Sequence, residues 1–291
     1  MGILKNKIEN EEWIDLRKFC SIKIGGKGKI IFFPKNKEEL SLLIREFGEK
    51  IIPLGLGSNI IFKDGEIDKI FIHTKNLKKI ELFEKNGFFY IKAEAGVSFK
   101  NIIEIVKKYN LEGFEYLSGI PATIGGAVAM NAGAFGVEVF DILEDVEWID
   151  NNGNIIYSKK EEIEHSYRYT RFQKDGFVFS ATLKLKKSDK DISQIIKNHL
   201  IQRNSKQPLD LPTAGSTYKN PENSYAGLLL EKAGYKGKRI NDIGFSEKHA
   251  NFLVNYGNAS FKDLMNLLQS AERDIKNLFN INLEREVKII G

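Results

Sequence analysis

One uncharged stretch, residues 119–136, constrains this chain more than any other feature. Five of its residues are glycine and five are alanine, and no Asp, Glu, Lys or Arg interrupts it. Small residues let main chains approach each other or a ligand closely, so close packing of backbone is one interpretation. The polar residues Thr123 and Asn131 within this stretch favour the other interpretation, a loop that faces a ligand.

A second glycine-rich segment, Gly55–Asn59, directly follows a short apolar run at residues 51–54. A tight turn explains it equally well, but glycine-rich turns also converge their N–H groups on anions. Two standard nucleotide loops are absent. The dinucleotide fingerprint needs a glycine where Ile60 stands, and no G-x-x-x-x-G-K-[ST] motif occurs. The two glycine-rich segments together predict a cradle for a larger cofactor.

Composition excludes several classes of protein. A length of 291 residues predicts two domains, with three small lobes as the alternative. The 44 basic and 39 acidic residues give a net charge of +5, too small to indicate nucleic acid but compatible with a polyanionic small ligand. Cys20 is the single cysteine and the four histidines lack metal-ligand spacing, so we expect neither a disulfide nor a metal. We expect a cytoplasmic protein without a membrane partner, because no leader-like or bilayer-length apolar run is present.

Local patterns predict a mixture of helices and strands. Asn36, Ser98 and Ser260 are candidate N-caps of helices, and a further helix is predicted from Ile192. Asn152-Gly153 predicts a hairpin, residues 177–185 alternate like a half-buried strand, and residues 207–221 read as a loop. Further strands are predicted at residues 27–33, 51–54, 88–93 and 286–290, and a boundary at 186–190. Because the predicted helices and strands do not alternate strictly along the chain, their order indicates α+β lobes rather than one doubly wound sheet.

Seven motifs follow one another along the chain: Gly55–Asn59, residues 118–136, Ser166-Tyr167-Arg168, Gln207-Pro208, residues 214–221, residues 246–252 and residues 283–287. In this order they resemble the motifs of the UDP-N-acetylenolpyruvoylglucosamine reductase (MurB) family, flavoenzymes of peptidoglycan precursor synthesis. The resemblance extends from about Phe19 to Gly291, and the spacing of 48 residues from Arg168 to Ser216 is similar to the type that lacks an extra tyrosine-bearing loop. The chain departs from the family pattern at Leu56, Ala122 and residues 240–243.

The resemblance implies an α+β fold with a two-lobed, PCMH-like FAD-binding region followed by a smaller α/β C-terminal substrate domain. The expected domains are residues 1–78, 79–187 and 188–291. FAD is expected to bind non-covalently, with NADPH as co-substrate. The expected cofactor-binding residues are Gly55, Leu56, Gly57, Ser58, Asn59, Gly119, Pro121, Ala122, Thr123, Gly125, Gly126, Asn131 and Gly133.

The implied reaction is reduction of UDP-N-acetylglucosamine enolpyruvate to UDP-N-acetylmuramate. The sequence does not determine the oligomeric state, and a monomer is the favoured expectation. Ser216 matches the family's proton donor to an enolate, and Arg168 matches the arginine that meets the substrate carboxylate, with Arg171 as the nearby alternative. Glu286 matches the C-terminal catalytic glutamate, with Glu284 as its alternative. Lys219 and Asn220 are expected to contact the nucleotide-sugar, although loop structure explains them equally well.

Two other functions stay open at this point. An FAD-linked oxidase of alcohols or sugars would share the N-terminal motifs, but the Ser216 and Glu286 motifs argue against it. A nucleotide-binding regulator or nucleic-acid binder has no supporting motif. His73 and Cys20 raise the question of a covalent flavin. The basic cluster Lys232, Lys236, Lys238 and Arg239 could meet a diphosphate, although such runs usually form a solvated face.

Overall fold

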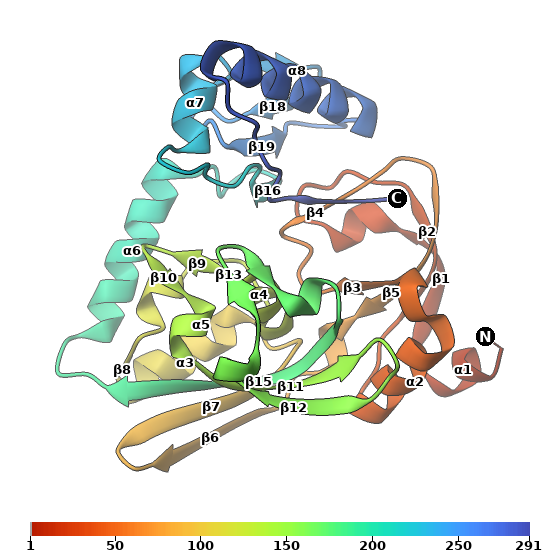
Figure 1. Cartoon of the computed structure of the whole chain (residues 1–291), viewed down its shortest axis with the longest axis vertical. Helices are drawn as coiled ribbons and strands as arrows, with labels where there is room; N and C mark the ends of the chain where they lie inside the picture. The colour runs from red at the N-terminus through yellow and green to blue at the C-terminus, as the bar shows by residue number, and fades with distance from the viewer. Residues whose placement is uncertain (1) are drawn as a thin grey trace. The chain divides into compact units, whose positions relative to one another are not determined.

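The computed structural model describes residues 2–291 (Figure 1). The chain forms two compact units, each assembled from several separate segments. The first unit comprises residues 1–12, 30–56 and 69–201. The second comprises residues 13–29, 57–68 and 202–291. Helices and strands are mixed throughout, which confirms the α+β prediction.

The first unit is built on a six-stranded antiparallel sheet with the order β12-β11-β15-β7-β6, and β8 pairs with β15. The helices α3, α4 and α5 lie on one side of it (Figure 1). Residues 151–154, which include Asn152-Gly153, join β11 to β12 in the hairpin that the sequence predicted, and Ile149 pairs with Ile155. The elements are β6 (Ile80–Lys85), β7 (Phe88–Glu94), α3 (Phe99–Tyr109), β8 (Leu111–Glu112), α4 (Ile124–Met130), α5 (Val139–Ile142), β11 (Leu143–Asp150), β12 (Ile155–Lys159) and β15 (Gly176–Lys187).

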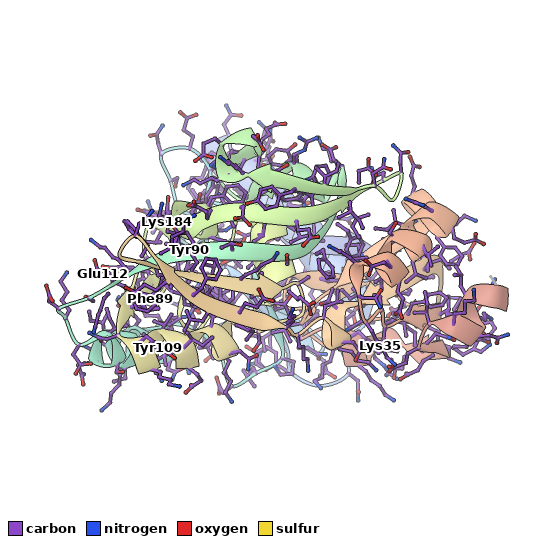
Figure 2. The ribbon with its side chains drawn as sticks, turned by 90° about the horizontal axis from the view of Figure 1, so that it is seen from below. Lys35, Phe89, Tyr90, Tyr109, Glu112 and Lys184 are labelled. Carbon is purple, nitrogen blue, oxygen red and sulfur yellow. The ribbon has the colours of Figure 1, made fainter. Side chains whose placement is uncertain are left out.

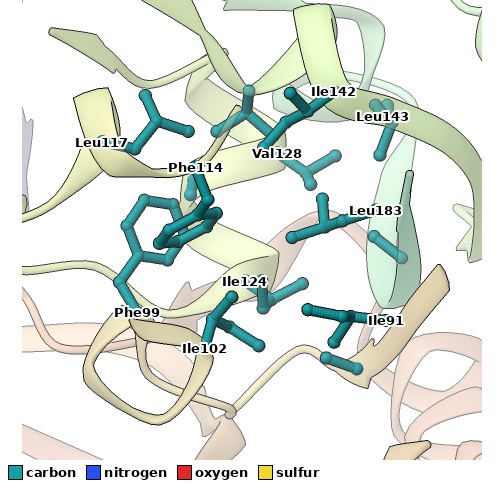
Figure 3. Close-up of a cluster of buried hydrophobic side chains, with 14 of the residues drawn as sticks. Ile91, Phe99, Ile102, Phe114, Leu117, Ile124, Val128, Ile142, Leu143 and Leu183 are labelled. Atoms are coloured by element: carbon teal, nitrogen blue, oxygen red, sulfur yellow. The ribbon is translucent and has the colours of Figure 1, made fainter. Parts of the chain in front are cut away.

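Apolar side chains between this sheet and its helices form the main core of the first unit (Figure 3). Phe99 of α3 packs edge-on against Phe114, with ring centroids 4.9 Å apart. On the opposite side of the sheet, Tyr90 of β7 pairs with Lys184 of β15, whose ammonium lies 5.8 Å from the tyrosine ring (Figure 2). The two faces of β7 therefore meet different surroundings, one a packed core and the other a polar and aromatic surface.

Strand β15 is buried more completely than predicted. We expected a half-buried strand, but Phe177 to Leu183 are buried on both faces. The second face is covered because Phe177 and Phe179 pack with apolar residues of α2 (Lys37–Phe47) in a second core cluster. The alternation of apolar and small residues in this strand therefore reflects two packed faces, not one solvated face.

A smaller four-stranded sheet has the order β1-β2-β5-β3, with β3 and β5 parallel. Its strands are β1 (Asn10–Asp15), β2 (Lys27–Phe32), β3 (Ile51–Leu54) and β5 (Glu66–His73), and α1 (Gly2–Lys7) precedes them. Asn36 caps α2 and Ser98 caps α3, each accepting an N–H from the third residue on. Both N-cap predictions are confirmed.

The second unit contains a four-stranded antiparallel sheet with the order β16-β19-β18-β17. Its apolar core includes Leu264, Leu268 and Ile275 of α8, a helix capped by Ser260 as predicted. Residues 288–290 pair in parallel with residues 60–62. The elements are β4 (Ile60–Phe62), β16 (Thr213–Ser216), α7 (Ala226–Lys232), β17 (Arg239–Ile240), β18 (Ile243–Phe245), β19 (Phe252–Asn255), α8 (Phe261–Phe279) and β20 (Lys288–Ile290); α6 (Ile192–Lys206) precedes β16.

Three sequence-based expectations need correction. The stretch 119–136 is not a loop throughout, because residues 124–130 form α4 and Gly125 packs so tightly that a Cβ there would lie 2.7 Å from the Cβ of Ala95. Residues 207–221 contain β16, paired with β19, where we expected only loop. The last strand begins at Lys288 rather than at Glu286. In each of these segments, a contact with a part of the chain that is distant in sequence determines the secondary structure.

Candidate active site

Two of the predicted cofactor segments meet in the first unit. A Cβ on Gly55 would lie 2.5 Å from the hydroxyl oxygen of Thr123, so only glycine fits there. Thr123 caps α4 by accepting the N–H of Gly126, and it forms an isolated bridge with Ser98. Neither Gly55-Leu56 nor residues 119–126 carry a charged side chain. An anionic cofactor would meet main chain and small side chains there, without a repelling carboxylate.

Gly57, Ser58 and Asn59 belong to the second unit and adjoin the segments that carry Ser216 and Glu286. Gly57 has φ +66°, and a Cβ there would lie 2.0 Å from the carbonyl oxygen of Phe19. The side-chain amide of Asn59 donates to the carbonyl of Glu286 at 3.1 Å. The carbonyl oxygen of Ser58 lies 3.7 Å from the position that a Cβ on Gly215 would take. The turn therefore adjoins both the Ser216 and the Glu286 segments.

Arg168 lies at the tip of a hairpin of the first unit, between β13 (His165–Ser166) and β14 (Tyr169–Thr170). Its backbone is left-handed, with φ 56°. The guanidinium donates to the carbonyl oxygen of Gly133 at 2.8 Å and to that of Asn131 at 3.2 Å. It also lies 3.4 Å from the carboxylate of Glu138. These contacts hold the charged group in one orientation before any ligand arrives.

Asn131 organises the surroundings of this arginine. Its side-chain amide donates to Glu138 at 2.6 Å and to the carbonyl of Ser166 at 3.1 Å. Its side-chain oxygen accepts the N–H of Phe140. Asn131 and Gly133, which we expected to contact the cofactor, therefore lie directly against Arg168. Sequence reasoning missed Glu138, because no pattern connects it to a residue so far along the chain.

The alternative residue Arg171 has structural partners. It pairs with Asp175 at 3.1 Å, and its guanidinium lies 5.1 Å from the centroid of the Trp148 ring. Its side chain is 36% exposed, against 15% for Arg168. The less exposed of the two arginines is therefore the one that the family motif indicates.

Ser216 and Glu286 lie on neighbouring segments of the second unit. The N–H of Glu286 donates to the carbonyl of Thr217, the residue after Ser216, at 2.9 Å. The N–H of Lys219 donates to the carbonyl of Glu284 at 2.8 Å, which makes the pairing antiparallel around Tyr218 and Arg285. Gly215 has φ 76°, a conformation that favours glycine, immediately before the serine. The structure therefore brings together two of the predicted catalytic residues.

Two residues that sequence reasoning did not single out fix this pairing. Asn251 accepts the N–H of Tyr218 at 2.9 Å and donates to its carbonyl at 2.8 Å. Glu272 of α8 accepts from one terminal nitrogen of Arg285 at 2.8 Å and from its Nε at 2.6 Å, and it accepts from the hydroxyl of Tyr218 at 3.3 Å. Burial and the Glu272 carboxylate raise the pKa of Tyr218, and its hydrogen bond to Glu272 raises the pKa of Arg285. Asn251 lies within the family motif at residues 246–252, whereas no sequence pattern indicated a role for Glu272.

The charged groups near Glu286 distinguish it from Glu284. Glu284 is 71% exposed and pairs with the ammonium of Lys219 at 2.6 Å. Glu286 is half-buried. Burial, together with the nearby charge of Lys219, lowers the pKa of Lys288, and the two glutamates partly offset this. Lys219 therefore forms its ion pair with Glu284, the alternative candidate for the catalytic glutamate.

Other predicted ligand residues have partners within the protein. The side chain of Asn220 is exposed and accepts the N–H of Ala226 at 3.1 Å, which shapes the entry to α7. In the basic cluster, Lys236 pairs with Glu231, Lys238 lies over Tyr235, and Arg239 lies over Tyr256. These contacts are typical of a solvated, mutually supported surface.

The two residues considered for a covalent flavin are both in protected environments. Cys20 is buried, donates to the carbonyl of Ile24, and has its pKa raised by burial. Burial lowers the pKa of His73 to about 4, and its Nδ1 accepts the N–H of Lys75. A buried protonated thiol and an imidazole engaged with the main chain are poorly suited to attack a flavin.

Comparison with known proteins decides the family. Residues 28–158 match the FAD binding domain model, and residues 207–290 match the C-terminal domain of UDP-N-acetylenolpyruvoylglucosamine reductase. A reductase of that name from Aquifex aeolicus is 42% identical over 95% of this chain and 94% of its own. The chain belongs to the UDP-N-acetylenolpyruvoylglucosamine reductase family. The members of this family are FAD oxidoreductases.

Further relatives agree with this assignment. The reductase of Fusobacterium nucleatum is 40% identical over 95% of this chain and 97% of its own. The crystal structure of the Thermus caldophilus family member superposes with a TM-score of 0.81 and 29% identity, and the match covers 98% and 99% of the two chains. The predicted fold class, an FAD-binding region followed by the family's C-terminal domain, is confirmed.

Residues 2–291 contain neither a metal-binding cluster nor a membrane-spanning helix. No three or more His, Cys, Asp and Glu side chains in this range gather in a way that would hold a metal ion. Within the same range, every helix is too short or too polar to span a bilayer.

Proposed function

We propose that this chain reduces UDP-N-acetylglucosamine enolpyruvate to UDP-N-acetylmuramate, with NADPH as electron donor and non-covalent FAD. Relatives that carry the reductase name align over almost the whole chain. The structural observation that carries the proposal is the hydrogen bond between the Glu286 N–H and the Thr217 carbonyl, which sets the two catalytic segments beside each other.

The residues of the glycine-rich segments fit a dinucleotide cofactor. Gly55 and Gly57 stand where any Cβ would collide, and Gly55-Leu56 and residues 119–126 contribute main chain and small uncharged side chains. When bound, FAD supplies the transfer of two electrons from NADPH to the vinyl carbon of the substrate. The buried Cys20 thiol and the His73 imidazole favour non-covalent binding. The proposed cofactor-binding residues also include Pro121, Ala122, Asn131 and Gly133.

Arg168 is proposed to bind the enolpyruvyl carboxylate, on which negative charge develops as the vinyl carbon is reduced. A guanidinium keeps its charge at any physiological pH and can bind two carboxylate oxygens at once. The carbonyls of Asn131 and Gly133 and the carboxylate of Glu138 fix its orientation in advance. Such preorganised charge stabilises an enolate without the cost of reorienting solvent.

Ser216 is proposed to deliver a proton to the α carbon of the enolate. A serine hydroxyl is a weak acid, so the donor needs a fixed position and a strongly basic partner. The β16 ladder, the left-handed Gly215 and the Thr217 hydrogen bonds to Asn251 and Glu286 hold the main chain on both sides of Ser216. Glu286, on the paired segment, is proposed to assist through the serine or a water molecule.

Lys219 and Asn220 are proposed to meet the nucleotide-sugar. Lys219 is only 19% exposed and its partner Glu284 is far more exposed, so the ammonium can exchange this partner for a phosphate oxygen. The division into residues 1–78, 79–187 and 188–291, the monomeric state and the cytoplasmic location stay predictions.

The direct test is an absorption spectrum of the purified protein, followed by anaerobic addition of NADPH and then of the enolpyruvyl substrate. We expect a yellow protein that NADPH bleaches and the substrate recolours. A protein that bleaches but does not recolour would favour the FAD-linked oxidase, which oxygen uptake with an alcohol or sugar would then reveal. A colourless protein that takes up no FAD would contradict the proposal.

A further inference from the structure

The hairpin of residues 133–138, which contacts the Arg168 guanidinium through Gly133 and Glu138, carries an aromatic residue in an unfavourable backbone conformation. Strands β9 (Gly133–Ala134) and β10 (Val137–Glu138) pair as Ala134 with Val137, which leaves a two-residue loop of Phe135 and Gly136. Both loop residues have positive φ, 54° and 80°. This is the geometry of a type I′ turn, in which asparagine or glycine is normally found first. A bulky residue there is an outlier that costs stability.

The same chain contains the usual solution to this turn. The β6–β7 hairpin pairs Lys85 with Phe88, and its two-residue loop is Asn86-Gly87. The φ angles of that loop are 53° and 78°, within two degrees of those of Phe135-Gly136. The two hairpins therefore share a turn geometry but differ in the first loop residue, so backbone geometry does not account for a phenylalanine at position 135.

The ring of Phe135 is displayed rather than buried. Phe135 is 40% exposed. Its ring stacks on His199 of α6, with centroids 4.5 Å apart and planes 20° apart, and His199 in turn lies 5.3 Å from Tyr116 (Figure 1 shows β9 and β10 beside α6). The Nδ1 of His199 contacts the carbonyl oxygen of Glu115 at 3.1 Å, which fixes its ring. The three rings form a supported stack with Phe135 outermost.

This stack is tied to the proposed carboxylate site. The carbonyl of Gly133, two residues before Phe135, accepts from Arg168, and Glu138, three residues after it, contacts the same guanidinium. A ligand whose carboxylate or phosphate reaches Arg168 therefore binds beside the hairpin that carries the partly exposed Phe135 ring. Flat rings bind such faces by offset stacking, largely independent of their hydrogen-bonding pattern.

We propose that Phe135, supported by His199 and Tyr116, is a stacking platform for a planar ring of a nucleotide ligand. The inference rests on the proposed function, which supplies two ligands with such rings, a uridine diphosphate sugar and NADPH. The shared chemistry is a flat heteroaromatic ring, and the experiment separates the two sources. The aromatic side chain is retained at a cost in stability because asparagine would satisfy the turn but bind no ring.

The test uses the holoenzyme with Phe135→Asn, which copies the loop at Asn86-Gly87. We expect its melting temperature to rise, and the Kd of either the UDP-sugar substrate or NADPH to increase about tenfold, the effect of losing one ring stack. Separate anaerobic titrations of flavin reduction by NADPH and flavin reoxidation by the substrate identify which ligand stacks. Phe135→Tyr is expected to restore wild-type binding.

Asn86→Phe is the matched control, because it places the same strain in a loop remote in sequence from the site. It is expected to lower the melting temperature and leave both affinities unchanged. Unchanged affinities in Phe135→Asn, or a melting temperature no higher than that of the wild type, would overturn the proposal. Calorimetry with UDP alone and NADP⁺ alone needs no turnover, so the platform is testable even if the wild-type protein proves not to reduce the enolpyruvyl substrate.

Discussion

The N–H of Glu286 donates to the carbonyl of Thr217 at 2.9 Å, which joins two segments that are distant in sequence next to the proposed proton donor. On the same paired segments, Lys219 and Glu284 make the next backbone hydrogen bond. The main chain, rather than side-chain packing alone, therefore sets the separation of Ser216 from Glu286. Substitutions of these two side chains should change chemistry with little effect on the local fold.

Ser216→Ala is expected to separate the two half-reactions. NADPH should reduce the flavin at the wild-type rate, because the hydroxyl has no role before the substrate binds. Reoxidation by the enolpyruvyl substrate should slow by about 10²- to 10⁴-fold, the usual contribution of one proton donor. Anaerobic stopped-flow absorbance measures both rates. A variant slowed equally in both half-reactions would argue that Ser216 positions the cofactor instead.

Glu286→Gln is expected to leave FAD bound and to nearly abolish substrate reduction. The amide keeps the size and the polar character of the side chain while removing its ability to gain or lose a proton. The bound flavin is counted from the visible spectrum, and turnover from NADPH consumption. Glu284→Gln is the control, because this exposed carboxylate pairs with Lys219, and it should change KM rather than kcat. Loss of flavin from Glu286→Gln would undo the assignment.

Glu138 is expected to act as a positioning residue for Arg168. Glu138→Ala removes one support of the guanidinium, which lies 3.4 Å away. We expect kcat for substrate reduction to fall about tenfold, while flavin reduction by NADPH is unchanged. Glu138→Gln should recover most of the loss because it retains a hydrogen-bonding oxygen. Failure of the glutamine variant to recover would point to a requirement for the negative charge.

Glu272→Ala is expected to destabilise the second unit. It removes the two carboxylate oxygens that accept from the Arg285 guanidinium and one acceptor of the Tyr218 hydroxyl. The pair is partly buried, with 28% and 26% of the two side chains exposed, so we expect a loss of about 2 kcal/mol in the free energy of unfolding. Urea denaturation measures it. Glu231→Ala, which removes an exposed partner of Lys236, is the control and should cost well under 1 kcal/mol.

His73 is expected to make stability depend on pH. Burial lowers its pKa from 6.5 to about 4, so the unfolded chain binds a proton at a higher pH than the folded chain does. The free energy of unfolding is therefore unaffected by this histidine above pH 6.5. As the pH falls from 6.5 toward 4, protonation of the unfolded chain lowers the free energy of unfolding by about 3 kcal/mol in total. Denaturation curves of wild type and His73→Asn from pH 7 to pH 4 should converge on acidification. Parallel curves would contradict the assignment.

Local features of the fold were predictable from the sequence, and long-range ones were not. Asn36, Ser98 and Ser260 cap helices through contacts with residues three positions away, so their signal is complete within a short window. The helix at residues 124–130 escaped prediction because glycine and alanine carry little amphipathic pattern, and its formation depends on packing against Ala95. The second buried face of β15 depends on α2, which is distant in sequence.

In the candidate site too, some residues were predictable from the sequence and others depend on long-range contacts. The family motifs indicated Arg168, Ser216 and Glu286, and the structure shows that main-chain pairing sets the last two on adjacent segments. The groups that hold them, Glu138 and Glu272, resemble ordinary surface glutamates in sequence. Their importance comes from which residues they face across the fold, and a single sequence contains no record of that.

The bond from Asn59 to the carbonyl of Glu286 joins residues 227 positions apart within one unit. A ribosome adding ~5–20 residues per second needs on the order of ten to fifty seconds between synthesising the two. Throughout that interval the early segments of the second unit have emerged without their partners, and strand β4 has an open edge where β20 will add. Nascent chains of this protein should therefore engage chaperones through residues 57–68 until synthesis of the C-terminal strand is complete.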